Sequence, residues 1–111
     1  MDKYTVQVPP AIFDQISSIK RYIEEVLQSP LAAEKKVRSI LKGIKSLESF
    51  PERGFDADAK VGRKISKTVS TKGILINNRK FLLFYTINEE EKVVHITHLL
   101  SSQTDYAKLF L

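Results

Sequence analysis

The chain has 111 residues, of which 42% are apolar and 28% are charged, and its formal net charge is +5. These values are typical of one folded globular domain, so we expect residues 1–111 to form a single domain. Because the chain has no cysteine, disulfides, thiolate zinc sites and cysteine nucleophiles are excluded. It also has no run of about 18 apolar residues, so we expect no membrane-spanning helix and no membrane partner.

The positive charge is concentrated in one segment. Residues 60–88 contain seven basic residues and no acid, whereas the rest of the chain has 11 basic and 13 acidic residues. A local positive field of this kind attracts phosphate groups or an acidic protein partner. The alternative is a solvated basic loop that only keeps the protein soluble. The basic residues of the segment are Lys60, Arg63, Lys64, Lys67, Lys72, Arg79 and Lys80.

The chain opens with the pattern of a strand followed by a helix. Apolar and polar residues alternate over residues 4–8, which predicts a strand with one buried face. Pro9 and Pro10 end this strand, because proline cannot donate a hydrogen bond to a neighbouring strand. Apolar residues then recur at spacings of three and four, which predicts an amphipathic helix over residues 10–28.

A second helix follows at once. Ser29 and Pro30 have the residue types of an N-cap and a first helical position, and a second apolar stripe runs from there towards Phe50. Pro51 stops the helix, since the residue before a proline avoids helical backbone angles. The connection is too short for the two helices to separate, so we expect an antiparallel helical hairpin that covers one face of a sheet.

The second half of the chain has the patterns of a loop and of strands. Residues 52–70 mix glycines, aspartates and the start of the basic segment, and we interpret them as a loop with room for a short strand over residues 65–69. A short apolar run at residues 73–76 precedes a turn at residues 77–80, where two asparagines tolerate left-handed angles. Residues 81–87 are apolar on both faces, which predicts a central strand.

A last strand is predicted over residues 93–100, after an acidic turn. Regular alternation would place His98 on the same face as Val94 and Ile96, and would point His95 to the opposite face. The two histidines would then be unable to share an ion, and we expect no metal site. Because turns this short pair strands antiparallel, the expected fold class is α+β: an N-terminal strand, an antiparallel α-hairpin, then antiparallel strands forming one sheet packed on the hairpin.

The sequence has no phosphate-binding glycine loop, no dinucleotide fingerprint and no specific Ser-His-Asp set, and we expect no cofactor. The remaining candidates are side chains that could bind or cleave RNA. Cleavage of RNA by its own 2′-hydroxyl needs a base, an acid and positive charge for the phosphate. The candidates are Lys64, Lys72 and Arg79 for binding RNA phosphates, and Tyr85, His98 and Tyr106 for proton transfer or base stacking.

Each candidate also has a structural interpretation. The three basic residues are equally typical of solvated surface charge, which contributes little. Tyr85 belongs to the predicted central strand, where a tyrosine usually packs in the core and hydrogen-bonds its hydroxyl. A partly buried, hydrogen-bonded His98 is the more common arrangement on a strand of this kind, and Tyr106 serves equally well as an anchor for the tail.

Several stretches resemble the RelE/ParE superfamily of bacterial toxin–antitoxin toxins, in the same order and with matching gaps. The opening strand at residues 4–8 resembles the start of the family, and residues 19–54 are similar to its helical hairpin and the proline that ends it. Residues 79–100 resemble its last two strands with the acidic turn between them, and residues 105–111 resemble its tail. The resemblance covers nearly the whole chain.

The resemblance implies a four-stranded sheet packed against the hairpin, and a cytoplasmic, growth-inhibiting toxin that a cognate antitoxin protein neutralises. Two activities occur in the family: RelE-like members cut mRNA on the ribosome, and ParE-like members inhibit DNA gyrase and are not nucleases. This chain departs from many relatives in having His98 where they have an arginine. Residues 101–104 are neutral, where many relatives carry basic residues before the Asp-Tyr pair that Asp105 and Tyr106 retain.

Ribosome-dependent mRNA cleavage is our main hypothesis from the sequence, because the basic segment falls in the part of the expected fold where RNA would lie. The alternative is a non-catalytic gyrase inhibitor, in which the hairpin surface and the basic segment bind protein. The neutral residues 101–104 and the long hairpin favour this alternative. A third hypothesis is an inactive family member that only binds its antitoxin.

Overall fold

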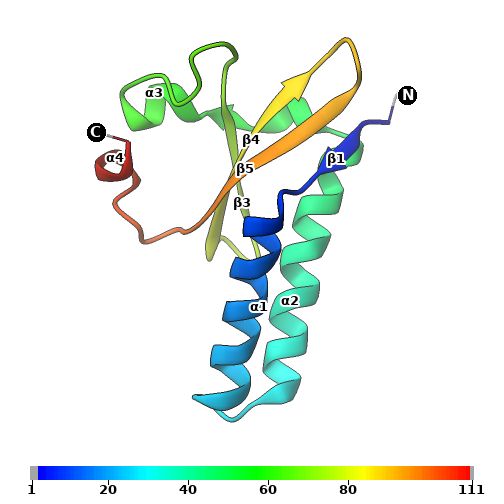
Figure 1. The fold of residues 1–111 in the computed structure, drawn as a ribbon, viewed down its shortest axis with the longest axis vertical. Coiled ribbons are helices and arrows are strands. Elements are labelled where there is room, and N and C mark those ends of the chain that lie inside the picture. Colours follow the sequence, from blue (N-terminus) through cyan, green and yellow to red (C-terminus); the bar gives the residue numbers. More distant parts are fainter. Residues whose placement is uncertain (1–2, 111) are drawn as a thin grey trace.

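The computed structural model describes residues 3–110, apart from the side chains of Tyr106 and Ala107. Figure 1 shows a helical hairpin that projects well beyond a twisted sheet, with two short helices away from the hairpin. The strands are β1 (Thr5–Gln7), β2 (Phe55–Asp56), β3 (Lys72–Ile76), β4 (Phe81–Asn88) and β5 (Val93–Ser101). The helices are α1 (Pro10–Glu25), α2 (Pro30–Lys45), α3 (Ala57–Val61) and α4 (Tyr106–Leu109), with 3-10 turns at Ser46–Glu48 and Pro51–Arg53.

The sheet confirms the α+β fold class and adds detail to it. Its five strands have the order β1-β5-β4-β3-β2. The strand pairs among β2, β3, β4 and β5 are antiparallel, as expected, but β1 runs parallel to β5, so the sheet is mixed. The strand beyond the four that the resemblance implies is β2, which pairs two residues with β3.

The helical hairpin confirms the local signals of the sequence. The Ser29 hydroxyl accepts a hydrogen bond from the Ala32 amide at 3.3 Å, and Pro30 is the first residue of α2. The first helix ends at Glu25, earlier than expected, and Gln28 has a left-handed φ of 53° in the connection. A 3-10 turn continues α2 before Pro51, so the second stripe is helical almost to the proline that stops it.

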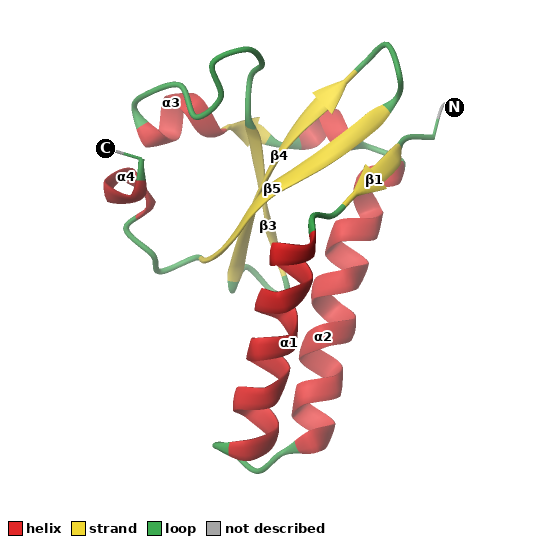
Figure 2. Ribbon diagram, in the orientation of Figure 1, coloured by secondary structure: helices red, strands yellow, loops and turns green. Residues whose placement is uncertain are grey.

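Two apolar clusters cover the two faces of the sheet, and Figure 2 shows the helices and strands that contribute to them. The larger cluster lies between the sheet and the hairpin. The smaller cluster lies on the opposite face, which we call the far face, under α3 and the C-terminal residues. Leu83 and Tyr85 of β4 belong to the first cluster, and Leu82 and Phe84 belong to the second, so β4 is the central strand that its two apolar faces predicted.

Residues 52–70 differ from the expectation of a loop with a strand at residues 65–69. The structure has β2 and α3 in the first half of this segment and no regular element over residues 65–69. The reason is local hydrogen bonding by aspartate side chains, which competes with strand pairing. The Asp58 carboxylate accepts from the Ile65 amide at 2.9 Å and from the Thr71 amide at 3.2 Å, while Asp56 caps α3.

A bulge in β5 changes which side chains share a face. Phe84 pairs with His98, but the next residue of β4, Tyr85, pairs with Ile96. Thr97 is therefore an extra residue in β5, and its hydroxyl donates to the Phe84 carbonyl oxygen at 3.2 Å. A bulge of this kind shifts the alternation by one residue for the rest of the strand.

The bulge makes two of the sequence-based expectations wrong. Val94 and Ile96 face the hairpin, whereas His98 lies with Phe84 on the far face. His95 pairs with Thr86, two residues beyond Phe84, so the register places both histidines on the far face rather than on opposite faces. Even so, residues 3–110 contain no group of three or more His, Asp or Glu side chains that could hold a metal ion.

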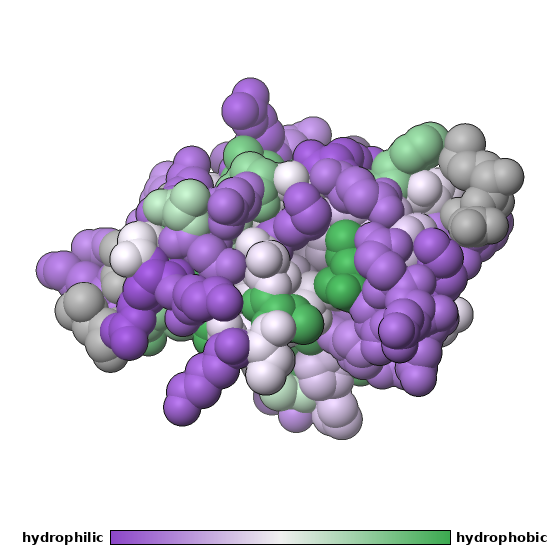
Figure 3. All heavy atoms as spheres, turned by 90° about the horizontal axis from the view of Figure 1, so that it is seen from above, coloured by the Kyte–Doolittle hydropathy of each residue, from purple (hydrophilic) through white to green (hydrophobic). Residues whose placement is uncertain are grey.

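Within residues 3–110, no helix has both the length and the apolar character needed to cross a membrane. Seen from the end opposite the hairpin tip, the surface is mostly hydrophilic, with a narrow apolar strip between hydrophilic side chains (Figure 3).

Candidate functional site

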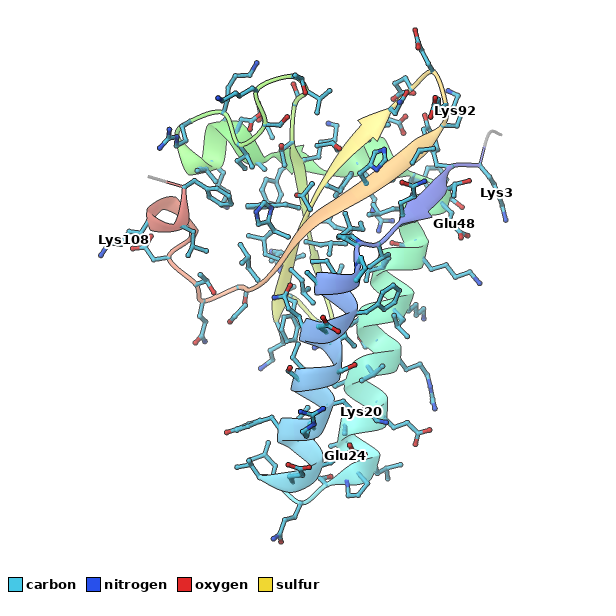
Figure 4. All side chains as sticks on the ribbon, in the orientation of Figure 1. Lys3, Lys20, Glu24, Glu48, Lys92 and Lys108 are labelled. Carbon is cyan, nitrogen blue, oxygen red and sulfur yellow. The ribbon has the colours of Figure 1, made fainter. Side chains whose placement is uncertain are left out.

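The far face of the sheet carries a cluster of three rings. The His98 ring packs edge-on against Phe84, with ring centroids 5.9 Å apart, and against Phe110, with centroids 5.0 Å apart. Phe110 follows α4 directly, so these contacts join the C-terminal residues to the body of the protein. The exposed side chain of Lys108 projects from α4 at the edge of the molecule (Figure 4).

His98 is held as a neutral imidazole. The side chain is half-buried, and its Nδ1 lies 2.9 Å from the Thr97 hydroxyl oxygen. Burial among aromatic rings lowers the pKa of His98 below its ordinary value, because a charged ring would lose its hydration. At neutral pH His98 therefore adds no positive charge to the far face.

Tyr85 lies on the other face of the sheet, in the core against the hairpin. Its side chain is 0% exposed, and its hydroxyl donates to the Pro51 carbonyl oxygen at 2.6 Å. Burial raises the pKa of Tyr85 to about 12, so the phenol keeps its proton at neutral pH. The sheet thus separates two of the candidates for proton transfer, Tyr85 and His98.

The third candidate for proton transfer, Tyr106, is the first residue of α4. Its side chain lies outside the described part of the structure. A catalytic role for Tyr85, His98 and Tyr106 stays a prediction from the sequence.

The three predicted phosphate-binding residues lie at three different places. Lys64 is exposed in the loop after α3. Lys72 is half-buried on β3, opposite Tyr85 in register, and so belongs to the face that packs on the hairpin. Arg79 lies in the turn between β3 and β4 and lines a pocket on the far face together with Lys60.

That pocket, which we call the basic pocket, has a volume of about 240 Å³. Its cations are Lys60 and Arg79, and its apolar wall includes Phe55, whose role the sequence did not reveal. An aromatic residue five positions before the first lysine of the basic segment is the signal that could have drawn attention to it. The lining residues are Phe55, Lys60, Leu75, Arg79, Leu82 and Ser102.

A larger and more apolar groove of about 660 Å³ runs along the hairpin, and we call it the hairpin groove. Several of its side chains are large and exposed, among them Tyr22 at 56% and Leu27 at 58%. Lys36 gives it one positive charge, with its Nζ 5.7 Å from the centre of the Phe81 ring. The groove is lined by Ser18, Ile19, Tyr22, Ile23, Leu27, Ala32, Lys36 and Phe81.

One further polar cluster lies at the end of the sheet near β1. The Tyr4 hydroxyl oxygen is 2.8 Å from Glu52 Oε1 and 2.7 Å from Glu89 Oε2. Lys92 Nζ lies 3.5 Å from Glu89 Oε2 and 5.2 Å from the centre of the Tyr4 ring, and Figure 4 shows Lys92 at this end. The hydrogen bond from the Tyr4 hydroxyl holds the pKa of Glu52 below its ordinary value. Because Tyr4, Glu52 and Glu89 are far apart in the sequence, the cluster joins three distant parts of the chain.

Two solved structures have a similar fold. A chain of the chromosomal ParDE toxin–antitoxin system from P. aeruginosa superposes with a TM-score of 0.66 at 15% identity, covering 89% of this chain and 96% of that chain. A chain of the archaeal RelE–RelB complex from Pyrococcus horikoshii OT3 superposes with a TM-score of 0.56 at 16% identity, covering 91% and 97%. At this identity the likeness shows the fold alone. A search of curated proteins found no match.

The sequence itself matches a family model over most of its length. The model describes the ParE toxin of the type II toxin–antitoxin system parDE, and it aligns with residues 6–106. This match confirms the resemblance to the RelE/ParE superfamily, and it falls on the ParE side of that superfamily. The chain therefore belongs to the ParE toxin family of type II toxin–antitoxin systems.

Proposed function

We propose that this chain arrests growth by inhibiting DNA gyrase, without cutting nucleic acid, and that an antitoxin protein neutralises it. The observation that carries the proposal is the match of residues 6–106 to the ParE family, which favours this alternative over the mRNA cleavage that the basic segment favoured.

The geometry of the candidate site supports a non-catalytic mode of action. Tyr85 is buried on the hairpin side of the sheet and keeps its proton, and His98 is a half-buried neutral imidazole on the far face. A general acid and a general base must both reach the same phosphate and its attacking hydroxyl. Residues 101–104 are neutral and themselves supply no cation to stabilise a developing phosphate charge.

A pair of assays on the purified chain tests the proposal. Relaxed plasmid, gyrase and ATP are incubated with increasing amounts of the chain, and mRNA with translating ribosomes is incubated in parallel and mapped by primer extension. We expect supercoiling to be lost and the mRNA to remain whole. Unaffected supercoiling at a large excess of the chain contradicts the proposal, and mRNA cleavage restores the nuclease hypothesis.

Two variants separate catalysis from binding. Tyr85→Phe and His98→Gln remove the two described candidates for proton transfer. If no bond is cut by this protein, folded variants should still arrest growth when they are expressed without an antitoxin. A nuclease that used either residue would lose at least about a hundredfold in rate, which is the smaller end of general acid–base contributions.

The hairpin groove fits the antitoxin part of the proposal. An amphipathic helix or extended segment of the antitoxin would cover the exposed apolar side chains of Tyr22 and Leu27, and acidic residues on it would pair with Lys36. The two solved relatives carry the names of toxin–antitoxin systems or complexes, which agrees with a partner of this kind. A segment that folds on this groove would raise the thermal stability of the pair over that of the toxin alone.

The Leu27→Glu variant tests the groove. A carboxylate placed among apolar residues and opposite an acidic partner is expected to weaken antitoxin binding at least about tenfold, which corresponds to about 1.4 kcal/mol. Leu41→Glu is the matched control, because Leu41 is an exposed leucine of α2 that does not line the groove. Equal binding by both variants in calorimetry would place the antitoxin elsewhere.

A further inference from the structure

We propose that the basic pocket binds a nucleoside phosphate, with the base against Phe55 and Leu75 and the phosphate on Lys60 and Arg79. The ligand is either a free nucleotide or one nucleotide unit of a nucleic acid, since both present a base and a phosphate to the pocket. The inference is independent of gyrase inhibition, because it is tested with the purified chain and small ligands alone.

The apolar half of the pocket suits a flat ring. The Phe55 ring lies across Gly73 of the neighbouring strand: a Cβ built at Gly73 would come within 2.6 Å of Phe55 Cζ. The absence of a side chain at position 73 therefore lets the half-buried ring lie against the sheet. Leu82 forms a buried floor, at 3% exposure, and Leu75 is 42% exposed at the side. Aromatic and aliphatic surfaces of this kind stack with nucleobases of any sequence.

The polar half of the pocket suits a phosphate. Lys60 Nζ lies over the Phe55 ring, 5.2 Å from its centre, so the cation and the aromatic surface share one site, and the flexible lysine stem lets the ammonium turn from the ring to a phosphate. Arg79 and Ser102 supply a guanidinium and a hydroxyl to the same pocket, and none of the acidic side chains within residues 3–110 lines it. A guanidinium can donate two parallel hydrogen bonds to a phosphate, and a lysine adds a compact positive charge.

The backbone at Arg79 supports a binding role. Arg79 has a φ of 66°, in the left-handed region that favours glycine, and it follows Asn77 and Asn78, which are also left-handed. Asparagine tolerates this region, whereas a long side chain is strained there. A strained residue kept at the rim of a pocket is typical of a functional position. Glycine would fit the turn better, but it has no cationic side chain to bind an anion.

The pocket is small, at about 240 Å³, and this favours a nucleotide over an acidic peptide. One base fills the apolar half while its phosphate reaches both cations, so one compact ligand uses every lining group. An aromatic side chain of a peptide would fill the same apolar half. The peptide, however, would offer Lys60 and Arg79 a carboxylate with a single negative charge, which matches two cations less well than a phosphate dianion does.

Adenosine monophosphate, uridine monophosphate and inorganic phosphate are each titrated into the full chain at about 0.1 M salt. Calorimetry or ligand-observed NMR measures the binding of each ligand. We expect both mononucleotides to bind more tightly than inorganic phosphate, because the base adds its stacking contact. Equal binding of inorganic phosphate and mononucleotides would overturn the proposal, since the apolar half would then contribute nothing.

Charge variants decide whether the pocket itself is responsible. Lys60→Gln and Arg79→Gln are each expected to weaken mononucleotide binding about tenfold, as expected for the loss of one charge-assisted hydrogen bond. Lys67→Gln is the matched control: Lys67 is an exposed lysine of the same basic segment that does not line the pocket. An equal loss in Lys67→Gln would mean diffuse attraction to the segment, and would overturn the proposal.

Arg79→Gly keeps the test valid if a glutamine disturbs the turn. Because glycine adopts the left-handed region without strain, this variant is expected to have a higher unfolding temperature than the parent and yet to bind mononucleotides about tenfold more weakly. A stabilised variant that still binds as tightly as the parent would overturn the assignment of the phosphate to Arg79.

Two competitors identify the source of the ligand. An eight-nucleotide single strand that binds much more tightly than the mononucleotide, and still depends on Arg79, identifies a nucleic acid; equal affinity identifies a free nucleotide. Both results support the proposal. A short peptide with phenylalanine between two glutamates is the other competitor. If it displaces the mononucleotide at equal or lower concentration, the pocket is a peptide site and the proposal is wrong.

Discussion

Tyr85 of β4 lies close to His98 of β5 along the sheet, because His98 pairs with Phe84, the residue before Tyr85. The two side chains nevertheless lie on opposite faces of the sheet. Burial raises the pKa of Tyr85 to about 12 and lowers the pKa of His98 below its ordinary value. Both shifts have the same cause, because burial disfavours the charged form of each side chain. At neutral pH both residues are therefore uncharged, and neither adds to the positive field of the protein.

The Tyr85→Phe variant tests the structural role of the buried hydroxyl. Removing it leaves the Pro51 carbonyl oxygen buried without its donor, which is expected to lower the free energy of unfolding by about 1–3 kcal/mol. The measurement is urea unfolding followed by circular dichroism. An unchanged unfolding midpoint would show that water replaces the hydroxyl and that the bond contributes little.

The His98→Phe variant tests the protonation state of the imidazole. The folded protein holds the pKa of His98 below the unfolded value of about 6.5, so the unfolded chain binds the proton more readily. The stability from neutral His98 is fully present above pH 6.5 and is lost as the pH falls through the folded pKa. We expect the unfolding midpoint of the parent to fall relative to that of His98→Phe between pH 8 and pH 5, and a constant difference would contradict this.

At the scale of elements, the hairpin and the bulge in β5 determine where side chains go. The hairpin begins its second helix with the Ser29 cap and Pro30, two signals that are local to a few residues. The bulge at Thr97 depends instead on how β5 pairs with β4, and it moves His98 from the hairpin face to the far face. The start of the second helix thus follows from a short stretch of sequence. The face of the sheet that each side chain of β5 occupies depends instead on how β5 pairs with β4.

The Ser29→Ala variant tests the cap of α2. Loss of the hydroxyl that accepts from the Ala32 amide is expected to lower the free energy of unfolding by about 1 kcal/mol. Ser17→Ala is the control, since Ser17 is an exposed residue in the interior of α1, where alanine is the better helix former. Thermal unfolding of both variants compares them, and an equal fall in both midpoints would exclude a specific capping effect.

At the scale of the whole molecule, a few side chains hold distant segments together. Tyr4 joins the start of the chain to Glu52, beside the end of the hairpin, and to Glu89, in the turn between β4 and β5. Gln15 of α1 donates to the Leu99 carbonyl oxygen of β5 at 2.9 Å, which ties the hairpin to the sheet. Such contacts stabilise the arrangement of elements rather than any one element.

The Tyr4→Phe variant tests the first of these ties. The Tyr4 hydroxyl lowers the pKa of Glu52 from 4.5, so its stabilising effect is present above pH 4.5 and is lost as the pH falls through the lower, folded pKa. We expect Tyr4→Phe to reduce the urea midpoint at pH 7 and to approach the parent protein in strongly acidic buffer. Tyr22→Phe, at an exposed tyrosine of α1, is the control. An equal deficit at both pH values would rule out a contribution from ionised Glu52.

Much of the fold could be predicted from the sequence, because its signals act over short distances. Ser29, Pro30 and Pro51 mark the second helix, and the two apolar faces of residues 81–87 mark a central strand. The basic segment and the ordered family resemblance likewise lie in the sequence. Together they indicate the toxin superfamily without reference to any tertiary contact.

The candidate site was less predictable, because it depends on residues that are distant in the chain. The buried Tyr85 hydroxyl finds its hydrogen-bond acceptor in the Pro51 carbonyl oxygen, 34 residues away in the chain. Phe55, Arg79 and Ser102 form one pocket only because β2, β3, β4 and β5 lie side by side. The order of the elements, the segregation of charge and the family could be predicted from residues 1–111 directly, since each depends on neighbouring residues or on a pattern along the chain. Which side chains meet could not be predicted in this way, because strand register, the bulge at Thr97 and burial arise from pairing across the sheet.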